Sequence, residues 1–259
     1  MSGRNSRGNR RRALEEARQA QQRRRRWQRL AAWGGAVAVV AGAGLGVGLG
    51  LSGSSSASGA VTAGGASYAP LSSLGTLTAA PAAGALGPEQ VPIPSVPMLA
   101  GTSAATTGQA IDGISCDTSE QTVFHIHTHL TIFVNGQQRQ VPAGIGIPDA
   151  VAQQTQAGPF IDSGTCFYWL HTHAADGIIH IESPVQRAYT LGEFFDEWGQ
   201  PLGTDQVGPA QGHVTVIYNG KVFEGNPRNV PLTAHAQIQL EVGTPLVAPE
   251  SISWTGTGL

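Results

Sequence analysis

Three Asx-Gly pairs in the C-terminal half of the chain constrain its fold more than any other feature. Asn135-Gly136, Asp176-Gly177 and Asn219-Gly220 each lie between segments in which apolar and polar residues alternate. An Asx-Gly pair in such a setting is a strong signal of a β-hairpin, because a two-residue turn of this kind needs a positive φ at both positions. The sequence therefore predicts three antiparallel hairpins.

Two of these hairpins are also alike in sequence. HLTIFVNG at residues 129–136 matches HVTVIYNG at 213–220, and an Arg-x-Val-Pro segment follows each. We interpret this match as an internal duplication of a hairpin unit. A further alternating segment, HAQIQLEVG at 235–243, predicts a last strand.

The chain between the first and third hairpins contains two candidate helices. In TLGEFFDEWGQP, Thr190 and Glu193 have the spacing of a capping box, and Gly199 and Pro201 end the apolar stripe between them. PDAVAQQTQAG, beginning at Pro148, predicts a shorter second helix.

The predicted fold class follows from these elements. It is mainly β with an α+β minority, in which antiparallel hairpins form a sandwich, an open barrel or a duplicated β-grasp-like domain with one or two short helices. A single transmembrane helix and a disordered linker are expected to precede this domain.

Charge and hydropathy divide the chain before this domain. Residues 1–30 contain eleven arginines and two glutamates, whereas residues 31–51 are 21 positions without a charged side chain. Such a length is enough for a helix to cross about 30 Å of hydrocarbon. The arginines place residues 1–30 in the cytoplasm by the positive-inside rule. We therefore expect a single-pass plasma membrane protein with its C-terminal domain extracytoplasmic, at a bacterial-type cell surface.

The alternative for residues 31–51 is a signal sequence, with secretion after cleavage near SASGA. The apolar run is longer than the roughly 7–15 residues of a signal peptide, which favours a retained anchor. Gly42, Gly46 and Gly50 have the spacing that lets two membrane helices approach closely, so a homodimer through this helix is a further expectation. Seven glycines in 21 residues also produce such a spacing by chance.

Composition separates a linker from the folded domain. Residues 52–111 are rich in Ala, Gly, Ser and Pro, and we expect a flexible tether. Residues 112–259 hold all eight histidines, with four basic and fourteen acidic side chains. The net charge of −10 excludes nucleic acid as a partner, because phosphate contacts dominate such binding.

Cys116 and Cys166 are the only cysteines of the chain, and both lie in the exported part. An oxidising compartment and an even count predict a disulfide between them. Metal binding by these cysteines is disfavoured, because neither lies in a Cys-x-x-Cys or Cys-x-His arrangement.

The histidines alternate along two of the predicted hairpins. In FHIHTHLTIF, His125, His127 and His129 share one face of a strand and the apolar residues share the other. In the second hairpin a two-residue turn pairs His173 with His180. A four-residue turn over 174–177 keeps the same faces and pairs His171 with His180 instead.

A metal site is the interpretation that this pattern favours. Two imidazoles at i and i+2 can bind one ion, whereas three over i to i+4 span about 13 Å and cannot easily share it. We expect two of the first three histidines to join histidines of the neighbouring strand. Glu182 is the candidate acid–base group, and Asp176 the alternative, although Asp176 also suits a turn. His213 and His235 are expected to be ordinary surface residues. The predicted metal ligands are His125, His127, His129, His171, His173 and His180.

Three functions fit this sequence. The first is a membrane-anchored extracytoplasmic protein that binds a transition metal, with Zn or Cu favoured and Ni or Fe also compatible with imidazole ligands. The second is a zinc-type hydratase or hydrolase with three histidines and an open position. The third is a pH-responsive cell-surface interaction domain. Whether the protein is an enzyme stays open, since no nucleophile motif or phosphate loop is present.

Overall fold

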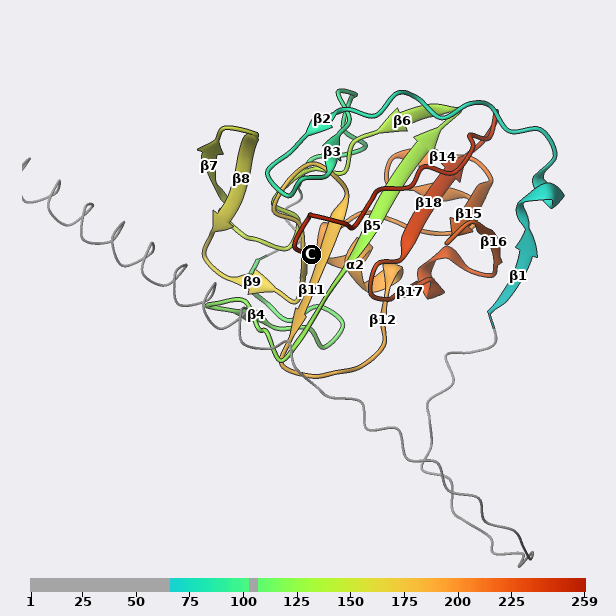
Figure 1. Ribbon diagram of the computed structural model, residues 1–259. Coiled ribbons are helices and arrows are strands. Elements are labelled where there is room, and N and C mark those ends of the chain that lie inside the picture. Colours follow the sequence, from blue (N-terminus) through green and yellow to red (C-terminus); the bar gives the residue numbers. More distant parts are fainter. Residues whose placement is uncertain (1–65, 103–106) are drawn as a thin grey trace, which may run out of the picture. The chain divides into compact units, whose positions relative to one another are not determined.

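The computed structural model describes residues 66–102 and 107–259 (Figure 1). The predicted Arg-rich segment, membrane span and glycine spacing all lie outside the described residues. Within the described ranges no helix is long and apolar enough to span a membrane.

One large mixed sheet dominates the described residues. It has eight strands, and β1 and β10 lie at its two edges. In spatial order its strands are β1 (Ser67–Pro70), β16 (Lys221–Glu224), β15 (Val214–Tyr218), β18 (Gln237–Val242), β5 (Phe124–Val134), β11 (Ile178–Ser183) and β10 (Leu170–His171), with β6 (Gln137–Arg139) also paired to β5.

Short two-stranded pairs and three helical segments surround this sheet. The pairs are β2 (Ala85–Leu86) with β3 (Pro92–Ile93), β4 (Cys116–Asp117) with β9 (Phe167–Tyr168), β7 (Val151–Thr155) with β8 (Gly158–Ser163), β12 (Tyr189–Thr190) with β17 (Pro231–Leu232), and β13 (Gln206–Val207) with β14 (Ala210–Gln211). The helical segments are the α-helix α2 (Leu191–Trp198) and the 3-10 turns η1 (Leu71–Leu74) and η2 (Pro227–Asn229).

Two of the predicted hairpins are confirmed with their two-residue turns. Asn135 and Gly136 join β5 to β6, and Asn219 and Gly220 join β15 to β16. All four turn residues have positive φ, between 49° and 75°, as the primed hairpin turns require. Every neighbouring pair in the large sheet is antiparallel except β18 and β5, which run parallel.

The Asp176-Gly177 hairpin has the register of the four-residue alternative rather than that of the two-residue turn, although residues 172–177 all lie outside the paired strands. His171 pairs with His180, and the pairing of His173 with His180 is wrong. The chain leaves the sheet after His171 because loops take its backbone hydrogen bonds. The amide of Thr172 donates to the carbonyl of Ile145 (3.1 Å).

The predicted helix at residues 148–158 is also wrong, because this segment forms the β7–β8 hairpin. All five residues of β7 are exposed, so the segment has no apolar stripe with which to pack as a helix. Pairing with β8 satisfies its backbone instead.

Residues 66–102, which we expected in the flexible linker, are ordered against the sheet. β1 pairs with the edge strand β16 in a four-residue antiparallel register. Val91 and Leu99 are buried, and Leu99 belongs to the main core. The prediction failed because it relied on the average composition of the segment, in which these few buried apolar residues are outnumbered by Ala, Ser and Pro.

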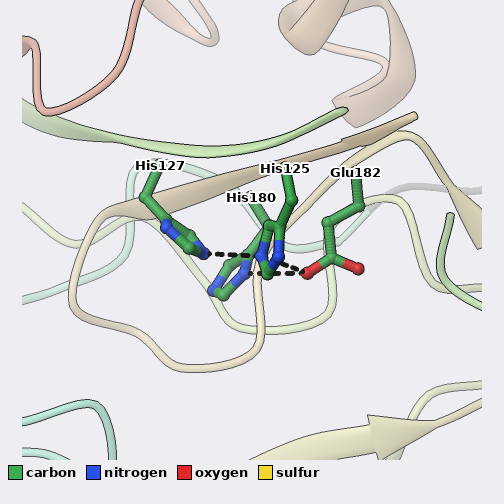
Figure 2. Close-up of side chains that lie close together, drawn as sticks. All are labelled: His125, His127, His180 and Glu182. Atoms are coloured by element: carbon green, nitrogen blue, oxygen red, sulfur yellow. Dashed lines mark hydrogen bonds and ion pairs between the residues drawn. The ribbon is translucent and has the colours of Figure 1, made fainter. Parts of the chain in front are cut away.

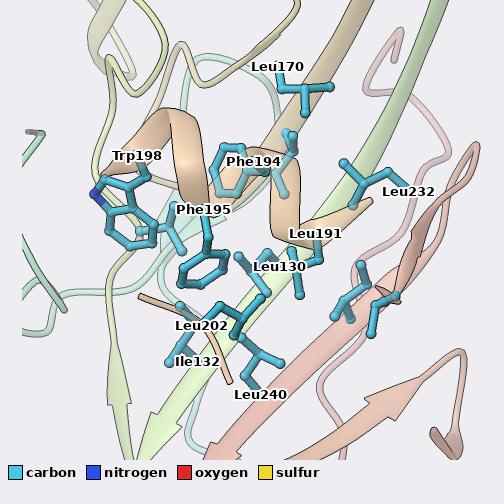
Figure 3. Packing of buried hydrophobic residues seen from close by; sticks show 14 of the residues in the cluster. Leu130, Ile132, Leu170, Leu191, Phe194, Phe195, Trp198, Leu202, Leu232 and Leu240 are labelled. Atoms are coloured by element: carbon cyan, nitrogen blue, oxygen red, sulfur yellow. The ribbon is translucent and has the colours of Figure 1, made fainter. Parts of the chain in front are cut away.

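Helix α2 supplies much of the core on one face of the sheet. The predicted capping box is confirmed, with the amide of Thr190 donating to Glu193 Oε2 (2.8 Å), and Gly199 ends the helix in the left-handed region. Figure 3 shows the apolar side chains of α2 gathered with those of β5 and β18. The labelled residues are Leu130, Ile132, Leu170, Leu191, Phe194, Phe195, Trp198, Leu202, Leu232 and Leu240.

The predicted disulfide joins Cys116 to Cys166, with the Cα atoms 5.4 Å apart. Cys116 belongs to β4, and Cys166 directly precedes the paired strand β9. The bridge therefore fastens the segment before β5 to the segment before β10, the two strands that begin the histidine cluster.

Removing this disulfide should destabilise the fold substantially. The bridge closes a sequence separation of 50 residues, which is worth about 4 kcal/mol in the chain-entropy account. We expect C116S/C166S to lose about that much unfolding free energy in urea titrations, and wild type under a thiol reductant to behave in the same way. A loss below about 1 kcal/mol would show that the denatured chain gains little freedom.

Candidate metal centre

Three neighbouring strands bring ionisable side chains to one face of the sheet. The antiparallel register of β5 with β11 sets His127 opposite His180 and His125 opposite Glu182. β10 then sets His171 opposite His180. Because side chains alternate along a strand, all five share one face, and the apolar residues between them face the core.

One close group consists of His125, His127, His180 and Glu182 (Figure 2). The Nε2 atoms of His125 and His127 are 3.0 Å apart, and His125 Nε2 is also 3.0 Å from Glu182 Oε1. His180 Nδ1 is 3.4 Å from the same oxygen. One ligand atom from each of the four residues lies within 4.8 Å of all the others.

A second group consists of His171, His173, His180 and Glu182, and one ligand atom from each of these residues again lies within 4.8 Å of all the others. All four residues are buried. The Nε2 atoms of His171 and His173 are 3.1 Å apart. The two groups thus share His180 and Glu182.

Backbone carbonyls fix the ring orientation of the second pair. His171 Nδ1 lies 2.8 Å from the carbonyl oxygen of Tyr168, and His173 Nδ1 contacts the carbonyl of Ile161. A carbonyl only accepts, so each Nδ1 carries the hydrogen, and each neutral ring presents a lone pair at Nε2. This arrangement is typical of metal-binding histidines, whose other ring nitrogen donates to an oxygen.

Glu89 plays the corresponding part for His180. Its Oε1 lies 2.7 Å from His180 Nε2, and both side chains are buried. Donation from Nε2 to this carboxylate leaves Nδ1, the nitrogen that faces Glu182, as the one that could bind a metal ion after losing its proton.

Burial keeps three of the histidines neutral near pH 7. It lowers the pKa of His171 to about 4 and that of His173 well below its ordinary value. Burial, helped by the charge on His180, also holds the pKa of His127 far below its usual range. Neutral imidazole is the form that binds metal.

His180 and Glu182 form the charged centre of the cluster. Burial opposes the imidazolium of His180, but hydrogen bonds with Glu182 and Glu89 outweigh it and raise the pKa to about 10. Burial likewise opposes the carboxylate of Glu182, but hydrogen bonds with His125 and His180 hold its pKa well below its usual range. A carboxylate that stays ionised is suited to serve as a metal ligand.

His129 lies apart from both groups, although it shares their strand and face. Its Nε2 is 3.1 Å from the carbonyl oxygen of Asp176. His129 and Asp176 instead line a cavity of about 270 Å³. His213 is exposed, and His235 stacks on Trp254 with ring centroids 4.6 Å apart.

Two carboxylates near the cluster escaped the sequence analysis. Glu89 lies in the segment that we expected to be a linker, and Glu120 Oε1 is 3.5 Å from His173 Nε2. Burial and the charge of Glu182 raise the pKa of Glu120 to about 7. One signal was available for Glu89, since it is the only charged residue among residues 52–111.

Comparison with known proteins gave no match to any protein-family model, curated protein or solved structure. The chemistry of the site is therefore inferred from its ligand atoms. Imidazole nitrogens with a carboxylate suit Zn, Cu, Ni and Fe. Adjacent ligands about 2.0–2.1 Å from one ion lie roughly 3 to 3.4 Å apart, which matches the observed Nε2 separations. The cluster is therefore able to hold a metal ion.

Replacing Glu89 by glutamine should lower the pKa of His180 in the metal-free protein, because one of the two carboxylates that favour its imidazolium is lost. A folded-state pKa of about 10 means that His180 stabilises the fold fully below its ordinary pKa of about 6.5, and that this contribution is lost as the pH rises through about 10. In E89Q the stabilisation by His180 should be lost at a lower pH than in the wild type. NMR titration of the imidazole measures the pKa, and urea unfolding at several pH values measures the stability. The exposed Glu224 provides the control E224Q, and an unchanged pKa in E89Q would contradict the assigned contact.

Proposed function

We propose that this protein binds a transition metal ion, Zn(II) or Cu(II), through His171, His173, His180 and Glu182. The observation that carries the proposal is the pair of Nε2 atoms of His171 and His173, 3.1 Å apart with both hydrogens held at the opposite nitrogens. Two lone pairs at this distance repel each other unless a cation lies between them.

A proton does not supply that cation near neutral pH. Burial keeps the pKa of His171 at about 4 and lowers the pKa of His173 further below its ordinary value. A metal ion binds both lone pairs at once, and His180 Nδ1 and Glu182 complete a set of four ligands. The carbonyls of Tyr168 and Ile161 and the carboxylate of Glu89 hold the three rings in this orientation.

The proposed place of this activity is the outer side of the plasma membrane. The support comes from the sequence, in which an arginine-rich segment (1–30) precedes an uncharged stretch of 21 residues (31–51). The disulfide is consistent with an oxidising compartment. A metal site of this kind, on a domain tethered to the membrane, would capture or buffer metal ions at the cell surface.

One observation favours a second candidate, a metal-dependent hydratase or hydrolase. Glu120 lies 3.5 Å from His173 Nε2, belongs to neither ligand group, and has 38% of its side chain exposed. A partly exposed carboxylate beside a metal ion is placed to accept a proton from metal-bound water. An exchangeable water on the bound ion would favour this function, and a closed shell of protein ligands would favour storage.

Metal content tests the proposed function directly. We expect the full-length protein from metal-replete cells to retain at least about one ion per chain after dialysis, and a chelator to lower its melting temperature. H173A should weaken binding beyond the roughly 10–100-fold that loss of an outer hydrogen-bond partner costs, because it removes a ligand itself. Elemental analysis and competition with a chromophoric chelator measure both.

The exposed His213 provides the matched control, and H213A should bind as wild type does. Equal losses in H173A and H213A would show that the wrong histidines were chosen. Occupancy below about 0.2 ion per chain, with no change in melting on adding Zn(II) or Cu(II), would contradict metal binding. A cluster that then changed shape only with pH would support the pH-responsive alternative.

A further inference from the structure

The two His-x-His pairs of the cluster fall into separate ligand groups. His125 and His127 belong to one, and His171 and His173 to the other. Ligands about 2.1 Å from one ion lie at most about 4.2 Å from one another. Among the described residues, no set of ligand atoms that all lie within even 4.8 Å of one another includes both pairs. A single ion therefore cannot take all four of these imidazoles in the observed arrangement.

His125 and His127, which are not ligands of the buried ion, form a second binding position. His125 Nε2 is 3.0 Å from His127 Nε2 and 3.0 Å from Glu182 Oε1. A carboxylate only accepts, so His125 Nε2 donates its hydrogen to Glu182 in the metal-free protein, with the neutral His127 ring beside it. One hydrogen thus lies where two nitrogens and an oxygen converge, which is a position that suits a cation.

Glu182 faces both ligand groups and is therefore placed to bridge two ions. Its Oε1 lies between His125 Nε2 and His180 Nδ1, at 3.0 Å and 3.4 Å. Its Oε2 is buried and has no hydrogen-bond partner. Because a carboxylate oxygen has more than one lone pair, Oε1 is placed to contact an ion in each of the two ligand groups.

We propose that the cluster holds a second transition metal ion, bound by His125, His127 and Glu182, with Glu182 bridging it to the first. This inference rests on the proposed function. The two ions would differ in access, because the ligands of the first are all buried, whereas His125 has 40% of its side chain exposed. With three protein ligands and an open side, the second ion would complete its coordination with water or a small anion.

Stoichiometry separates this proposal from the function on which it rests. Full-length protein loaded with Zn(II) should carry about two ions per chain, and H125A/H127A about one. One ion in the wild type, retained in the variant, would overturn the second site and leave the proposed function intact. One ion lost in the variant would mean that His125 and His127 serve the only site. No ion in the wild type would overturn both proposals.

A variant of similar shape reduces the risk of misfolding, and a spectroscopic signal tests the bridge independently. H125N/H127N keeps the shape of the side chains, and it should also bind about one ion while melting as wild type does in a chelator. Two Cu(II) ions that share a carboxylate couple magnetically. The wild type loaded with copper should therefore give less EPR intensity per copper than H125N/H127N, and equal intensities would contradict the bridge. H213A should match the wild type in both measurements.

Discussion

The antiparallel register between β5 and β11 is the constraint on which the rest of the site depends. It sets His127 opposite His180 and His125 opposite Glu182, and all four side chains share one face. A shift of one residue would move the histidines into the apolar core and the isoleucines out of it. Packing of the half-buried Ile126 and the buried Leu130 on the core side of this strand therefore fixes the positions of the ligands. The hydrophobic effect thus helps to specify the polar site, because packing of the apolar face favours this register.

Burial of so many ionisable groups costs free energy, and the structure shows how each group is neutralised or paired. His171 and His173 give up their charge and satisfy one nitrogen each on a backbone carbonyl. His180 keeps its charge and lies between two carboxylates, Glu89 and Glu182. What remains uncompensated is the set of lone pairs that face one another at the centre. A bound cation would satisfy these lone pairs. The atoms that lack a partner in the metal-free protein are therefore the proposed metal ligands.

Local signals in the sequence predicted local structure well. The Asn-Gly turns, the capping box of Thr190 and the disulfide are confirmed, because each depends on residues whose chemistry allows few alternatives. The parallel pairing of β18 with β5 has no turn signature, and the β7–β8 hairpin was mistaken for a helix because an exposed polar segment carries no clear period. Strand parity predicted one cluster of six histidines. Five of them lie in the two ligand groups, but parity could not show that His129 lies too far along β5 to join them.

The contact between Glu89 and His180 has a consequence for how the folded unit is delimited. Composition places the start of the domain near Asp112, more than twenty residues after Glu89. A fragment cut there would lack the acceptor that orients His180, and it would leave β16 as a bare edge without β1. Such a fragment would expose an unpaired strand to self-association and would present a loosened imidazole to any ion. The smallest autonomous unit of this protein therefore includes the stretch whose composition most resembles a tether.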